Sequence, residues 1–109
     1  LRSPDNMANP YLAFSVALAG AMDGIRAGQE PSLAVDENLV RYDDAELVRL
    51  GIPSLPQTLG DALYQLAESD LVRSALGDYV CDQFLQVKRS EWSDYRRYVS
   101  PWERERYGD

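Results

Sequence analysis

The chain has 109 residues and a mass of 12.3 kDa, which is enough for one small domain and too little for two ordinary ones. With 45% hydrophobic and 27% charged residues, it has the composition of a folded protein, which excludes a disordered tail and a fibrous protein. Eighteen acidic residues against eleven basic ones give a net charge of −7, which repels phosphate backbones and anionic lipid. We therefore expect no nucleic-acid partner and no membrane partner.

The residue types that the chain lacks exclude several kinds of active site. It has no histidine and a single cysteine, Cys81. It therefore cannot form a zinc, copper or iron–sulfur site, or a nucleophile paired with histidine, from its own residues. A lone cysteine excludes an internal disulfide, and the N-terminal residues show no signal-peptide pattern. We expect a cytoplasmic location.

The first predicted helix spans about residues 10–27. Asn9 is a favoured N-cap, Pro10 suits the first helical turn, and Gly28 is placed to end the helix. Apolar residues lie all round its axis, which is typical of a helix buried on nearly all sides. Its uncharged stretch is shorter than the roughly 20 residues that cross a bilayer. A small domain can hardly supply the cover that such a helix requires.

The rest of the chain is also predicted to be mainly helical. Residues 28–42 have no clear period and are expected to form an extended surface loop, followed by a short helix from 43 to about 50. Pro53 and Pro56 then prevent regular structure. Three further helices are expected, over about 59–68, up to residue 76, and from about 78 to just before residue 101. Residues 102–107 are interpreted as a short charged tail, and residues 1 and 2 as the possible end of a strand.

The last long helix carries an apolar stripe in steps of three and four residues. The stripe consists of Cys81, Phe84, Leu85, Lys88, Trp92, Tyr95 and Val99. Cys81 is expected to be a small core residue. The aromatic residues near the C-terminus indicate core or subunit contacts, because no basic groove accompanies them.

Two groups of charged residues are candidates for a binding site. The guanidinium of Arg2 could clamp a carboxylate or phosphate, although an arginine three residues before Asp5 is more typical of a local ion pair. The acidic residues of the loop lack the spacing of a calcium loop and are expected to be solvated. They are Asp36, Glu37, Asp43, Asp44 and Glu46.

One motif has a specific spacing, R-x-P-D-x-x-x-N-P-Y-L from Arg2 to Leu12. Weaker matches follow at Gly24-Ile25, Asn38-Leu39, Leu55-Pro56, Leu59, Ala62-Leu63, Leu66, Lys88, Glu91 and the run Val99 to Tyr107. Together they resemble the C-terminal part of the catalytic domain of glutamine synthetase. The resemblance implies that residues 1–109 are a segment of that domain. The fold class expected for these residues is mainly α, as the helical C-terminal portion of an α+β domain.

The resemblance implies an ATP-dependent ligase that forms glutamine from glutamate and ammonia through γ-glutamyl phosphate. It implies that Arg2 is the catalytic and substrate-binding residue that contacts glutamate. It also implies that ATP and Mg²⁺ or Mn²⁺ are held by residues upstream of this segment. No metal-binding or cofactor-binding residue is then expected here, and the segment alone should be inactive. The family implies a homo-oligomer of stacked rings.

Three alternatives stay open at this stage. Relatives of this family that glutamylate polyamines or other amines share the same C-terminal pattern, so the amine acceptor is open. A non-catalytic helical interaction module is a further possibility. Val40 stands where some bacterial members carry an adenylylated tyrosine, with Tyr42 two residues later. This replacement argues against that form of regulation.

Overall fold

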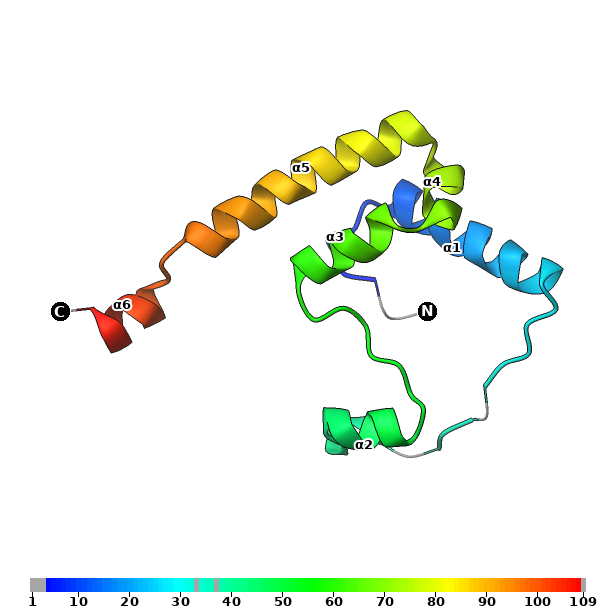
Figure 1. The fold of residues 1–109 in the computed structure, drawn as a ribbon, viewed down its shortest axis with the longest axis horizontal. Coiled ribbons are helices and arrows are strands. Elements are labelled where there is room, and N and C mark those ends of the chain that lie inside the picture. The colour runs from blue at the N-terminus through cyan, green and yellow to red at the C-terminus, as the bar shows by residue number, and fades with distance from the viewer. Residues whose placement is uncertain (1–3, 33, 37, 109) are drawn as a thin grey trace.

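The structure is a computed structural model that describes residues 4–32, 34–36 and 38–108. Within these ranges the chain forms helices joined by extended segments, with no strand (Figure 1). This agrees with the mainly α class expected from the sequence. The elements are α1 (Pro10–Arg26), the short 3₁₀ helix η1 (Leu39–Arg41), α2 (Asp44–Arg49), α3 (Leu59–Ala67), α4 (Asp70–Leu76), α5 (Asp78–Arg97) and α6 (Pro101–Tyr107).

The helix boundaries follow from local capping. The Asn9 side chain accepts hydrogen bonds at the start of α1, as predicted. Thr58 and Ser69 do the same for α3 and α4. Gly77 separates α4 from α5. Its φ of 80° turns the chain between the two helices, and glycine is suited to this position because a residue with a side chain would be strained there. Most of these ends agree with the sequence prediction to within about two residues. The exception is α5, which ends at Arg97, so Val99 of the predicted stripe lies beyond the helix.

Two segments differ from the sequence prediction. Residues 39–41 of the expected loop form η1, capped by the Asn38 side chain. The expected C-terminal tail is helical as α6, because Ser100 and Glu103 form a reciprocal capping box and Pro101 occupies the first turn. The strand considered at residues 1 and 2 lies outside the described residues.

A small core holds α3, α4 and α5 together. Leu63, Cys81 and Leu85 are buried, which confirms Cys81 as a core residue. Leu66, Ala67, Leu76 and Trp92 pack against these three residues and are partly buried. The apolar stripe of α5 is therefore covered only in its first part, and Tyr95, near the end of the helix, is 71% exposed.

Helix α1 packs on α4 but is otherwise uncovered. None of its residues is buried, and Tyr11, Phe14, Leu18 and Ile25 are mostly exposed. The sequence predicted burial on nearly all sides, whereas the described residues cover this helix on one side only. No described helix is both long and apolar enough to cross a membrane.

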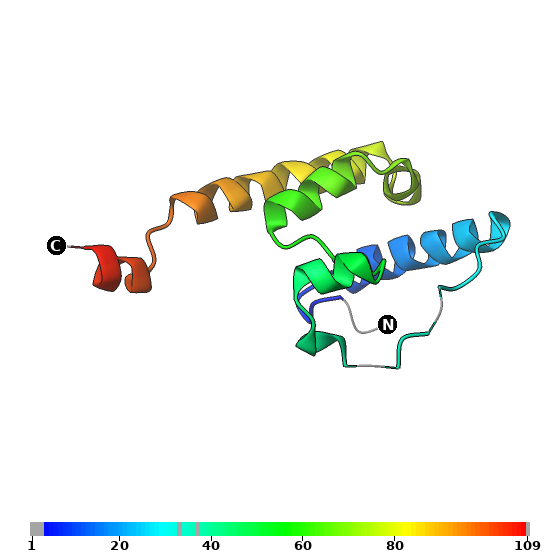
Figure 2. The ribbon, with the colours of Figure 1, turned by 60° about the horizontal axis from the view of Figure 1, so that its bottom comes forward.

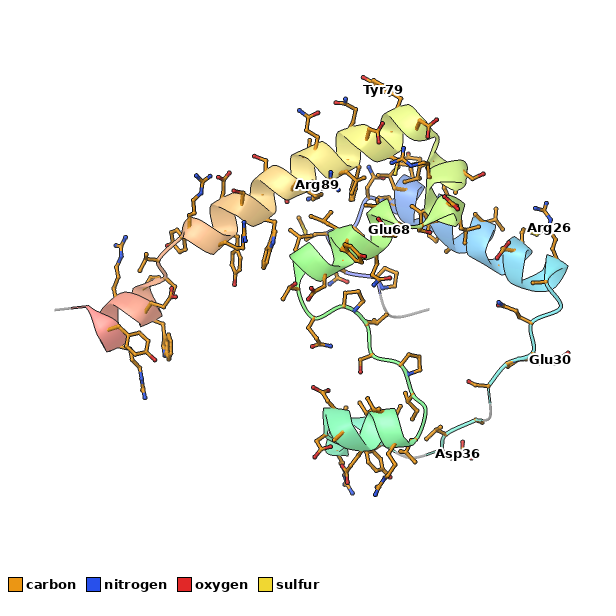
Figure 3. All side chains as sticks on the ribbon, viewed as in Figure 1. Arg26, Glu30, Asp36, Glu68, Tyr79 and Arg89 are labelled. Atoms are coloured by element: carbon orange, nitrogen blue, oxygen red, sulfur yellow. The ribbon has the colours of Figure 1, made fainter. Side chains whose placement is uncertain are left out.

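The overall shape is open. The extents are 58 × 40 × 23 Å, and the radius of gyration is 17.6 Å, against roughly 13 Å for a compact chain of about 100 residues. In both ribbon views α5 extends away from the core and α6 lies at its far end (Figures 1 and 2). Glu30 and Asp36 lie along the connection between α1 and α2, away from the core (Figure 3).

Candidate functional site

The described part of the N-terminal motif is a turn that leads into a capped helix. The Met7 N–H donates to Oδ1 of Asp5 (2.7 Å), and the Ala8 N–H donates to the Asp5 carbonyl oxygen (3.0 Å). Oδ1 of Asn9 then accepts from the N–H groups of Tyr11 (3.0 Å) and Leu12 (3.4 Å). Two short polar side chains therefore hold the backbone in successive turns, which is how Asp and Asn stabilise such geometry.

Arg2, the candidate substrate contact, lies outside the described residues. Its role in binding glutamate therefore stays a prediction. The sequence indicates Asp5 as an ion-pair partner of Arg2, and the structure adds a different role for Asp5, which accepts hydrogen bonds from the backbone. The signal for this role was present, since an aspartate directly after a proline is a common turn former.

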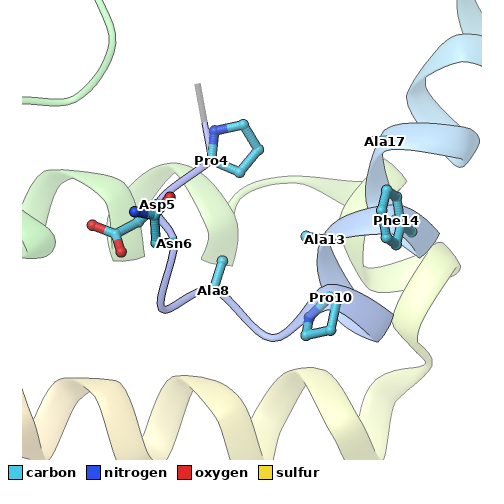
Figure 4. A pocket seen from close by; sticks show the side chains of 8 residues that line it. All are labelled: Pro4, Asp5, Asn6, Ala8, Pro10, Ala13, Phe14 and Ala17. Atoms are coloured by element: carbon cyan, nitrogen blue, oxygen red, sulfur yellow. The ribbon is translucent and has the colours of Figure 1, made fainter. Parts of the chain in front are cut away.

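A hollow of about 320 Å³ lies beside this turn and the first half of α1 (Figure 4). It is lined by Pro4, Asp5, Asn6, Ala8, Pro10, Ala13, Phe14 and Ala17. Asp5 is the one ionisable side chain among these eight, and its carboxylate is directed away from Phe14 and Ala17 (Figure 4). The described residues that line the hollow therefore include no nucleophile paired with a base.

A second, apolar groove of about 350 Å³ connects the turn to the helical core. Pro4 and Ala8 border it on the motif side, and Leu66, Leu76 and Phe84 border it on the side of α3, α4 and α5. Leu12, Ala13, Val16 and Ala17 of α1 complete the lining, so the turn borders a groove that α1 and the core also border.

Two acidic residues of the loop, Asp43 and Glu46, have a structural role. Asp43 accepts from the Glu46 N–H (2.8 Å), and Glu46 accepts from the Asp43 N–H (3.0 Å), so the pair is the capping box of α2. No group of three or more His, Cys, Asp or Glu residues within the described ranges is arranged to hold a metal ion.

The shifted pKa values also belong to structural contacts. Hydrogen bonds to Asp78 and then Asp82 raise the pKa of Arg73, whose Nη1 lies 3.1 Å and 3.0 Å from the two carboxylates. Hydrogen bonds from the backbone and then the side chain of Ser100 lower the pKa of Glu103. Arg73 joins α4 to α5 and Glu103 caps α6, so neither shift marks a reacting group.

The aromatic residues near the C-terminus form local pairs. Trp92 stacks on Tyr95 with ring centroids 5.8 Å apart, and Trp102 meets Tyr107 edge to face at 6.0 Å. Trp92 also packs on the core, whereas Trp102 and Tyr107 are mostly exposed. Contact with the core is thus confirmed for Trp92, and subunit contact stays a prediction.

Comparison with known proteins identifies the class. The family described as glutamine synthetase, catalytic domain, matches residues 1–107, so the chain belongs to this family. A glutamine synthetase of Halobacterium salinarum is 40% identical over 107 residues, which are 98% of this chain and 24% of that protein. A glutamate–methylamine ligase of Methyloversatilis universalis is 44% identical over 103 residues, which are 94% of this chain and 23% of that protein.

A solved structure of apo GmaS without ligand has the same helical arrangement. Its TM-score with this chain is 0.82 at 33% identity, and the match covers 100% of this chain and 25% of that one. The expected resemblance and the mainly α fold class are both confirmed. The chain spans about a quarter of the length of the curated relatives it matches.

Proposed function

We propose that this chain is the C-terminal segment of the catalytic domain of an ATP-dependent ligase that joins glutamate to ammonia. The family match over residues 1–107 carries the proposal, together with the motif from Arg2 to Leu12. In this reaction the γ-carboxylate of glutamate attacks the terminal phosphorus of ATP and releases ADP. Ammonia then attacks the carbonyl carbon of γ-glutamyl phosphate and displaces phosphate.

Arg2 is the residue of this segment that we assign to the reaction. Its planar guanidinium suits a carboxylate and stabilises negative charge that develops on the γ-carboxyl group. The described residues do not form a site for Mg²⁺ or Mn²⁺, so we assign the metal ions and ATP to other parts of a longer protein and derive no step through them. The segment alone is then inactive. We also propose a cytoplasmic homo-oligomer of stacked rings.

The Arg2 assignment predicts a large effect in the full-length protein. Arg2→Ala should lower kcat/KM for ATP-dependent ligation by about 100-fold to 1000-fold, the usual effect of removing one charge-stabilising donor. Arg2→Lys should recover part of this loss, because it keeps the charge and loses the donor fork. Arg26→Ala, at the end of α1, is the matched control and should have wild-type kinetics. Unchanged kinetics in Arg2→Ala would refute the assignment.

An organic amine in place of ammonia is the alternative acceptor for the same type of ligation. The relative named glutamate–methylamine ligase is 44% identical, beside 40% and 41% for two glutamine synthetases, which keeps a substituted amine open as the acceptor. Product formation from ammonia, methylamine and a polyamine, each with ATP and glutamate, separates the candidates. A higher kcat/KM for an organic amine would replace ammonia in the proposal.

A non-catalytic helical module is the alternative from another class. It requires the 109-residue chain to be stable alone, whereas the open shape and the exposed apolar residues of α1 favour a segment of a larger domain. The mass of the native polypeptide tests this. A mass several times 12.3 kDa supports the ligase, and a mass near 12.3 kDa supports the module.

A further inference from the structure

The described helices form two pairs that are held in different ways. Helices α3 and α5 share the buried core, because Leu63 belongs to α3 and both Cys81 and Leu85 belong to α5. Helices α1 and α4, which are described in full, contain no buried residue. They pack on each other where Gly20 lies next to Leu71. The pair α3 and α5 is therefore fixed by burial, whereas α1 and α4 depend on other contacts for their position.

Helix α4 lies where α1, α3 and α5 meet (Figure 1). Glu68 and Ser69 link it to α3, and Gly77 alone links it to α5. Gly77 has a φ of 80° and a ψ of 155°, and within the described residues no side chain caps the start of α5. A glycine backbone permits more orientations than that of any other residue. The backbone at Gly77 therefore restricts the angle between α4 and α5 only weakly.

Arg73 of α4 crosses this glycine to reach α5. Its Nη1 lies 3.1 Å from Oδ1 of Asp78 and 3.0 Å from Oδ1 of Asp82. These aspartates are four residues apart, so they lie on the same face of α5, one turn from each other. A single ion pair would still allow rotation about the contact. One cation between two carboxylates restricts the direction of α4 as well as its distance from α5.

The position of α1 depends on α4. The apolar groove of about 350 Å³ separates α1 from the core, with Leu12 and Val16 on the side of α1 and Leu66 and Phe84 on the side of α3 and α5. Because packed side chains do not fill this space, α1 gains little cover from α3 and α5. Its packing on α4 therefore determines where it lies.

We propose that Arg73 is a latch that holds α4, and with it α1, in a fixed position on the core of α3 and α5. Gly77 is the hinge of this device, and the carboxylates of Asp78 and Asp82 are the groups that hold the latch closed. When these contacts break, α1 and α4 move together and the width of the groove changes. The device involves only described helices and does not depend on the reaction proposed above.

Amide hydrogen exchange in the full-length protein tests the latch, because it reports the opening of each helix separately. Arg73→Gln removes the cation. Arg97→Gln is the matched control, because it breaks an ion pair of 2.8 Å to Asp94 within α5. We expect Arg73→Gln to raise exchange in α1 and α4 about threefold to tenfold, and to leave α3 and the second half of α5 unchanged. Arg97→Gln should leave α1, α3 and α4 at wild-type rates.

Charge reversal separates the latch from a local effect of Arg73. Arg73→Glu places three carboxylates together and should raise exchange in α1 further. The double variant Arg73→Glu with Asp82→Arg again puts one cation between two carboxylates, and it should restore most of the protection. A role confined to the end of α4, where a cation stabilises the helix, would change exchange in α4 alone. That result would overturn the proposal.

Salt provides a test that needs no variant. The side chains of Asp78 and Asp82 are mostly exposed, so about 1 M NaCl should screen their attraction to Arg73. Exchange in α1 should then rise in the wild type and stay constant in Arg73→Gln. If Arg73→Gln does not fold, the response of the wild type decides alone. Unchanged exchange of α1 in Arg73→Gln, no recovery in the double variant, or a wild-type α1 that is insensitive to salt would each overturn the latch.

Discussion

Gly60 shows how one residue determines the packing of two helices. It lies in α3 with an ordinary helical backbone, and a Cβ atom built on it would lie 2.5 Å from Nε1 and 2.7 Å from Cε2 of Trp92. Real Cβ atoms do not approach heavy atoms so closely. The absence of a side chain therefore lets the indole of α5 lie directly on α3. Glycine is needed here for the close contact with Trp92, and not for its conformational freedom.

Gly60→Ala should destabilise the protein, although alanine favours helices over glycine by up to about 1 kcal/mol. Displacing the rigid indole, which packs on the core, should cost about 1–3 kcal/mol and outweigh that gain. Gly20→Ala is the matched control, because its Cβ would meet only Cδ2 of Leu71, at an ordinary 3.9 Å. Thermal unfolding should give a lower Tm for Gly60→Ala and an equal or higher Tm for Gly20→Ala. A raised Tm in Gly60→Ala would contradict this packing.

Capping determines the individual elements, and α6 is the clearest example. The Ser100 N–H donates to Oε2 of Glu103 (2.7 Å), and the Glu103 N–H donates to the Ser100 hydroxyl (3.2 Å). These bonds satisfy backbone groups that a helix of seven residues would otherwise leave to water. The helix therefore depends on a contact that titrates.

The helicity of α6 should fall in acid. The hydrogen bonds from Ser100 lower the pKa of Glu103 below its ordinary 4.5, so the charged form is the one that the folded helix favours. This stabilisation is present above pH 4.5 and is lost as the pH falls through the lower, folded-state pKa. Amide NMR signals of residues 101–107 would follow the loss.

Glu103→Ala should remove this acid transition and lower the helicity of α6 at neutral pH. Glu105→Ala, on the same helix but outside the capping box, should keep the transition. If both variants kept the wild-type pH profile, the capping box would not be its cause.

The whole molecule has more apolar surface than a small core can cover. Three of the residues that the structure describes are buried hydrophobic core residues, while Tyr11 and Phe14 of α1 are 83% and 76% exposed. Contiguous apolar surface of this kind usually marks a contact with another part of a protein. The relative from Halobacterium salinarum is about four times longer than this chain. Under the proposed function, the rest of such a longer protein covers the exposed apolar surface.

The isolated 109-residue chain should therefore associate with itself. The double variant Phe14→Gln and Leu18→Gln should shift it towards the monomer in sedimentation experiments, because both side chains lie on the uncovered part of α1. Val48→Gln, on α2, exchanges an equally exposed apolar residue outside that helix and should have a smaller effect. A chain that stays monomeric at high concentration, with a cooperative melt, would instead support an independent module.

The sequence predicted the elements that depend on local chemistry. Asn9, Thr58 and Ser69 cap helices because their side chains reach backbone groups two or three residues away, and such contacts can be read from spacing. The same signal was present at Ser100 and Glu103 but was missed, because the charged residues that follow Pro101 were interpreted as a tail. The motif around Arg2 also indicated the family correctly.

By itself, then, the sequence determined where most of the helices begin and end, the apolar stripe of α5 and the family. Only the tertiary structure decided which apolar residues are covered. It packed Leu63 and Leu85 against Cys81, left Phe14 and Tyr95 exposed, and brought Gly60 against Trp92. The physical reason is that capping acts between neighbours in the chain, whereas burial depends on contacts between helices that lie far apart in the sequence.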